Sequence, residues 1–166
     1  MLVFCAAALF ADSVAGLKWT APPGWKSQGR TRMRAATDSL PAAPGDAEGA
    51  ECVIYFFGAG QGGSVEANIE RWKGQFSEPG GHPAAAKVGK RTIHALPVTT
   101  IQSAGDYSGM AGPMTPGGAV KHHYRLLGAI IEGPGGNVFI KFAGPEKTVA
   151  TQQGHFEELL NSFAKE

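Results

Sequence analysis

The segment from Gly58 to Ser64, GAGQGGS, contains the spacing G-x-G-x-x-G of a phosphate-binding turn. Between a strand and a helix, such a turn exposes backbone N–H groups and the helix N-terminus to an anion. A dinucleotide site also needs an acidic residue at the end of a second strand about 20 residues further on. Glu78 lies near that distance, but it directly precedes Pro79 and is predicted to lie in a loop. We interpret the turn as a connector, with an anion- or nucleotide-binding module as the alternative, formed by Gly60, Gly62, Gly63 and Ser64.

Five histidines could suggest a metal site. His122 and His123 are adjacent in a predicted strand, where neighbouring side chains point to opposite faces, so the pair cannot close on one ion. Structural zinc sites draw several ligands from short spacings, which the other three histidines do not provide. We therefore expect neither a metal nor another cofactor.

A catalytic nucleophile is not evident in the sequence. Ser64 precedes a predicted helix but lacks the G-x-S-x-G elbow of a hydrolase. Cys52 lies in a strand that is apolar on both faces, which favours a core position over a reactive thiol. We expect a binding or assembly-accessory domain rather than an enzyme. A small enzyme with an unrecognised site is kept as an alternative.

A long glycine- and proline-rich loop, Gly109 to Gly118, is the candidate contact region. Loops on a rigid scaffold often carry binding residues. Methionine side chains adapt to varied surfaces, and tyrosine is enriched at interfaces. The alternative is a mobile loop without a binding role. The predicted partner- or ligand-binding residues are Tyr107, Met110, Met114, His122 and Tyr124.

Composition bounds the class of protein. The 166 residues suit one domain, and 24 Gly with 11 Pro indicate generous loops. The formal net charge is +1, which gives no reason to expect a nucleic-acid partner. The partner is therefore predicted to be a protein or a small ligand.

The N-terminal segment has the features of an export signal. Residues 2–11 are all apolar, whereas a membrane-spanning helix needs about 20 such residues. Ser13-Val14-Ala15 supplies a small-x-small cleavage site, so residues 1–15 are predicted to be a signal peptide and 16–166 the single mature domain. The mature protein would be periplasmic or secreted and not inserted in the membrane. No Lys or Arg precedes the apolar run, which indicates a start further upstream; a buried N-terminal helix is the alternative.

The candidate binding residues are predicted to lie on a fold that consists of a sheet with few helices. Residues 52–57 and 122–131 read as strands that are apolar on both faces, the second forming a glycine hairpin with residues 138–142. An amphipathic helix is predicted over 64–76, and a last helix begins at Gly144-Pro145. Further strands are predicted at 17–20, at 33–39 and, interrupted near Pro97, at 91–102. The predicted class is α+β, an α/β/α sandwich with a mainly antiparallel sheet covered by helices.

Several features occur at characteristic spacings along the chain: Pro23-Gly24-Trp25, the strand beginning His122-His123-Tyr124, the glycine hairpin, Val138 to Phe142, and a closing helix ending Ser162-Phe163. Together they resemble the layout of the PsbP-like superfamily, which includes extrinsic photosystem II proteins and an accessory protein of nuclear transport. The resemblance implies an α/β/α sandwich used for binding or assembly without catalysis. It implies no individual functional residue, because the match is one of spacing.

We predict that the mature protein begins at Gly16. N-terminal sequencing and intact-mass measurement of material from the native host test this prediction. A mature chain that retains the apolar residues 2–11 would contradict it.

Overall fold

The computed structural model describes residues 11–109 and 119–166. Its elements, in chain order, are β1 (Asp12–Val14), β2 (Leu17–Trp19), β3 (Lys26–Ser27), β4 (Arg34–Leu40), β5 (Ala50–Tyr55), α1 (Val65–Lys73), β6 (Phe76–Ser77), β7 (Ala86–Ile93), β8 (Leu96–Tyr107), β9 (Lys121–Gly133), β10 (Gly136–Pro145), α2 (Glu146–Thr151), α3 (Gln153–Ser162) and β11 (Ala164–Lys165). No helix in these two ranges is both long and apolar enough to cross a membrane.

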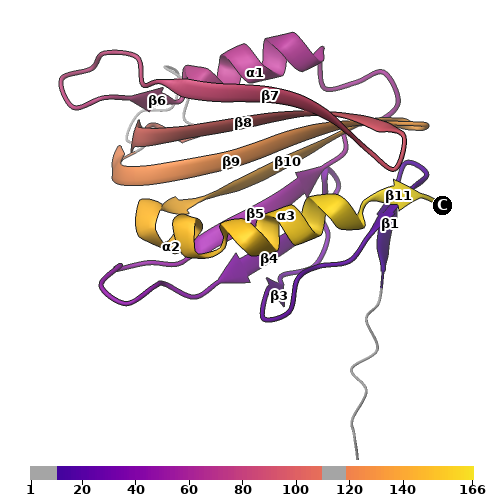
Figure 1. Cartoon of the computed structure of the whole chain (residues 1–166), viewed down its shortest axis with the longest axis horizontal. Helices are drawn as coiled ribbons and strands as arrows, with labels where there is room; N and C mark the ends of the chain where they lie inside the picture. Colours follow the sequence, from indigo (N-terminus) through magenta and orange to yellow (C-terminus); the bar gives the residue numbers. More distant parts are fainter. Residues whose placement is uncertain (1–10, 110–118) are drawn as a thin grey trace, which may run out of the picture.

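One strongly twisted antiparallel sheet dominates the structure (Figure 1). Its strand order is β3-β4-β5-β10-β9-β8-β6, and β7 forms a hairpin with β8. A small second sheet, β1-β2-β11, joins the two ends of the described chain. The predicted α+β class with a mainly antiparallel sheet is confirmed, although strands make up far more of the chain than helices do.

The two faces of the sheet carry separate apolar cores. On one face, Ile54 and Phe142 pack with α3 residues such as Phe156 and Leu160. On the other face, Val53 and Phe139 pack with Trp72 of α1. The predicted alternation along residues 52–57 is therefore confirmed, because neighbouring side chains of a strand point to opposite faces.

The helices differ from the sequence prediction at their ends. The helix predicted over 64–76 ends at Lys73, and Phe76 instead begins β6 while staying buried. Pro145 is the last residue of β10 and precedes α2 rather than beginning the helix. The last helix is split in two at Gln152. The strand prediction near Pro97 was also displaced: the chain turns at His94 and Ala95, and Pro97 lies within β8.

Residues 12–15, directly before the predicted cleavage point, are part of the fold. Strand β1 pairs with β2, and the Ala15 carbonyl accepts a hydrogen bond of 3.0 Å from the Gly135 N–H. Cleavage after Ala15 would separate β1 from β2. The boundary of the signal peptide stays a prediction.

The glycine turn between β5 and α1 is shaped by packing. Gly62 has a φ of +90°, and a Cβ there would lie 2.7 Å from the Phe57 ring and 2.8 Å from the Phe139 ring. Glycine is thus required for a close approach of the backbone to the core as well as for a left-handed conformation. Gly60 also has a positive φ, of +69°, but its Cβ would have no neighbour within 4 Å.

We predict that Gly62→Ala lowers the free energy of unfolding by about 2–4 kcal/mol, from overpacking plus a left-handed residue. The matched control Gly60→Ala carries only the conformational cost, about 1–2 kcal/mol. Urea unfolding of both variants measures the difference. Equal losses would show that packing against the two phenylalanine rings does not matter.

Candidate functional site

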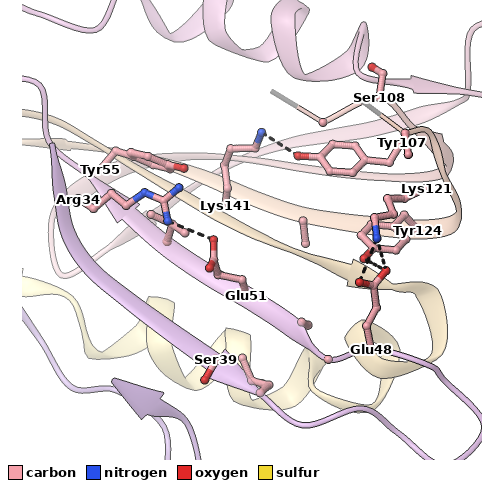
Figure 2. A pocket seen from close by; sticks show the side chains of 17 residues that line it. Arg34, Ser39, Glu48, Glu51, Tyr55, Tyr107, Ser108, Lys121, Tyr124 and Lys141 are labelled. Carbon is pink, nitrogen blue, oxygen red and sulfur yellow. Dashed lines mark hydrogen bonds and ion pairs between the residues drawn. The ribbon is translucent and has the colours of Figure 1, made fainter. Parts of the chain in front are cut away.

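The α1 face of the sheet is only partly covered, and a pocket of about 680 Å³ opens on the remainder (Figure 2). Helix α1 has nine residues and packs beside β8. Beyond it, side chains of β4, β5, β9 and β10 stay open to solvent or only partly covered. Its lining includes the charged and aromatic residues Arg34, Glu48, Glu51, Tyr107, Tyr124 and Lys141.

A β-bulge in β9 brings two of the lining side chains to the same side. Tyr124 pairs with Gly105 and Lys121 pairs with Tyr107, so two residues of β9 oppose the single residue Asp106. His123, one of the two, has a φ of +56°. An extra residue of this kind re-aims the strand. Lys121 and Tyr124 therefore both line the pocket, which strict alternation would not allow.

Stacked aromatic rings form one wall of the pocket. The rings of Tyr107 and Tyr124 are 5.7 Å apart and within 10° of parallel. Tyr107 also stacks on Phe76, at 4.8 Å. Burial raises the pKa of Tyr107 to about 12, so its hydroxyl stays protonated at neutral pH. The wall therefore offers flat apolar area with neutral polar tips.

The two carboxylates of the pocket are each paired with a cation. Glu51 lies 3.3 Å from Arg34, and Glu48 lies 2.9 Å from Lys121 (Figure 2). The Tyr124 hydroxyl also donates a hydrogen bond of 2.6 Å to Glu48. The hydrogen bonds from Tyr124 and Lys121 lower the pKa of Glu48, so this carboxylate is ionised at neutral pH.

Lys141 is the third cation of the pocket, and its surroundings differ from those of the other two. It is only 6% exposed. Its Nζ donates to Gln75 Oε1 at 2.7 Å and to the Tyr107 hydroxyl at 3.5 Å. It also lies 5.7 Å from the centre of the Trp72 ring. None of the ion pairs within residues 11–109 and 119–166 involves Lys141.

Burial lowers the pKa of Lys141 to about 8, and the Arg71 guanidinium adds to the effect. At neutral pH most molecules still carry the ammonium. The pocket therefore contains a positive charge that is shielded from water. An amide oxygen, a phenol and an indole face surround it, and no carboxylate is paired with it among the described residues.

The pocket brings together two of the five residues predicted to contact a partner. Tyr107 and Tyr124 line it, and so do Gly109 and Ala119. His122 is exposed and lies 2.8 Å from Asp106, outside the lining. Met110 and Met114 lie outside the residues that the structure describes.

Sequence reasoning missed the charged residues of the pocket. Lys141 carries a signal that could have been recognised, since it is the one charged residue in the apolar strand VFIKF. Arg34, Glu48 and Glu51 carry none, because a sheet register and a loop bring them together from distant points of the chain.

The glycine turn satisfies many of its polar groups internally. The Ser64 hydroxyl accepts a hydrogen bond from the Ala67 N–H, and the Asn68 side chain donates to the carbonyls of Gly62 and Ser64. A second pocket of about 530 Å³ includes Ser64. Its lining contains two cations and two carboxylates: Lys90, Arg91, Glu66 and Glu132. The turn thus presents no excess positive charge to an anion, and its binding role stays a prediction.

No group of three or more His, Cys, Asp or Glu side chains is arranged to hold a metal ion in the part of the chain that the structure describes.

Comparison with known proteins identifies the fold. No protein-family model matches the chain, and no curated protein matches it. Among solved structures, it is similar to the Pseudomonas aeruginosa protein PA94, of unknown function, with a TM-score of 0.54, 14% identity, and coverage of 95% of this chain and 96% of that one. It is also similar to cyanobacterial PsbP (CyanoP) from Synechocystis sp. PCC 6803, with a TM-score of 0.51, 14% identity, and coverage of 95% and 91%. The predicted PsbP-like fold is confirmed.

We predict that the difference in unfolding free energy between the wild type and Lys141→Met depends on pH, because the buried ammonium is costly. Because the folded-state pKa of Lys141 is lowered to about 8, the folded protein binds fewer protons than the unfolded chain above that pH. The stability of the wild type should therefore rise relative to Lys141→Met by about 2 kcal/mol between about pH 7 and about pH 10.

Urea unfolding of the two proteins across this range measures the change. The other ionisable groups near Lys141 are Arg71 on α1, Arg34 on β4, Glu51 and Tyr55 on β5, Tyr107 on β8 and Tyr124 on β9, and they are common to both proteins. A stability difference that stays constant with pH would contradict the assigned environment of Lys141.

Proposed function

We propose that this protein is an exported, non-enzymatic binding domain and that the tyrosine-walled pocket is its ligand site. The observation that carries the proposal is the convergence of Tyr107 and Tyr124 with a buried lysine on the uncovered part of the α1 face. Concave sites with apolar walls and a few convergent polar groups are the usual form of ligand pockets. The helices on both faces, with α1 opposite α2 and α3, also support the α/β/α sandwich that the resemblance implies.

The pocket chemistry favours binding over catalysis. A carboxylate that acts as a general base must be free to take a proton. Glu48 and Glu51 are each held by a cation, and Glu48 by a phenol as well. Lys141 is the group that keeps the enzyme alternative open, because a desolvated amine is a potential nucleophile.

Export is supported by the N-terminal sequence. The apolar residues 2–11 and the following small residues suit a signal peptide. We propose a periplasmic or secreted location on this basis.

A pocket-blocking variant tests the proposed ligand site. Ala143 lines the pocket, so Ala143→Phe would fill it without removing a polar group. We expect a screen of small aromatic fragments by two-dimensional NMR to shift the amide signals of Tyr107, Tyr124 and Lys141. Ala143→Phe should weaken these hits at least tenfold.

Ala150→Phe is the matched control, because Ala150 is exposed on α2 against the opposite face of the sheet. It should leave the fragment affinities unchanged. Fragments that bind elsewhere on the surface, or that bind Ala143→Phe as well as the wild type, would contradict the proposed site.

A further inference from the structure

We propose that the pocket takes a small organic monoanion, with its carboxylate paired to the Lys141 ammonium and a flat apolar body against the Tyr107–Tyr124 wall. This inference rests on the proposed function and specifies the chemical class of the ligand. It follows from the charge, the remaining hydrogen-bond capacity and the shape of the pocket.

The charge of the pocket is unbalanced at one point. Arg34 and Lys121 have carboxylate partners, whereas Lys141, which is only 6% exposed, has none among the described residues. A buried charge without a counterion is costly, and an incoming anion would relieve that cost. The Arg71 guanidinium strengthens the local positive potential.

Lys141 also has a hydrogen bond left to give. An ammonium carries three N–H donors. One is used at 2.7 Å by Gln75, and a second makes only a long contact of 3.5 Å with Tyr107. The Tyr107 hydroxyl itself can donate to the same anion. A carboxylate oxygen at this point would therefore meet two donors.

The remaining residues limit the ligand to a single negative charge. Glu48 and Glu51 both line the pocket, and each forms an ion pair with a cation. The three cations Arg34, Lys121 and Lys141 set against these two carboxylates leave one positive charge, which a monoanion balances and a phosphate dianion or a nucleotide would exceed. The stacked tyrosines favour a planar apolar body, which packs against aromatic rings in an offset arrangement.

Benzoate, benzyl alcohol and inorganic phosphate are the probes that test this assignment, each titrated into the whole protein at neutral pH and followed by NMR. Benzoate and benzyl alcohol share a ring and differ in charge. We expect benzoate to bind in the pocket at least tenfold more tightly than benzyl alcohol and phosphate. Equal affinities for benzoate and benzyl alcohol in this pocket would overturn the inference while leaving the proposed function intact.

Lys141→Met adds a direct test of the charged group, since Met keeps the length of the side chain. It should reduce benzoate affinity at least tenfold and change benzyl alcohol affinity less than twofold. The matched control Lys87→Met removes the same charge from an exposed position on β7 and should leave both affinities unchanged. Unchanged benzoate binding by folded Lys141→Met would overturn the inference.

Two further outcomes are decisive. If neither aromatic probe shifts the pocket amides, both the proposed function and this inference fail. If phosphate binds most tightly and shifts the amides of residues 60–64, the anion site is the glycine turn and the inference is overturned.

Discussion

The ammonium of Lys141 lies near the centre of an antiparallel sheet, and the residues around it have to compensate for its loss of contact with water. Its strand lies between β5 and β9, so backbone neighbours flank it on both sides. The residue paired with it on β9 is Gly128, where a Cβ would lie 2.8 Å from the Trp72 ring. The missing side chain lets the indole approach, and Trp72 and Gln75 then solvate the cation from the α1 side.

The two faces of the sheet are covered unequally. The opposite face is sealed by α2, α3 and the small sheet, and its members Phe142, Leu160 and Phe163 are fully buried. The α1 face has one helix of nine residues, and the part of the sheet beyond it forms the pocket. Ion pairs between Arg34 and Glu51 and between Lys121 and Glu48 keep the remaining charges balanced, so the chemical character of the site is set by Lys141 and the tyrosines.

Local sequence patterns predicted the parts of this structure that depend on local physics. Alternating apolar residues in 52–57 specified a strand buried on both faces, and Ser64 specified the start of α1. The apolar stripe misled at Phe76, because a buried aromatic at helical spacing can equally begin a strand. Tyr107 and Tyr124 were predicted from residue type, but their partners were not. Arg34 meets Glu51 through the pairing of β4 with β5, and Glu48 meets Lys121 and Tyr124 beside the bulge at His123. Hydrophobic periodicity encodes neither arrangement.

The most direct test of the central role of Lys141 is its titration by NMR in protein labelled at the lysine side chains. We expect a pKa of about 8 for Lys141, lowered by burial, and a rise in that pKa when benzoate is bound. Lys87, exposed on β7, serves as an internal reference for the effect of benzoate on a surface lysine. A Lys141 pKa in the ordinary range of a lysine, unchanged by benzoate, would contradict the central role of this residue.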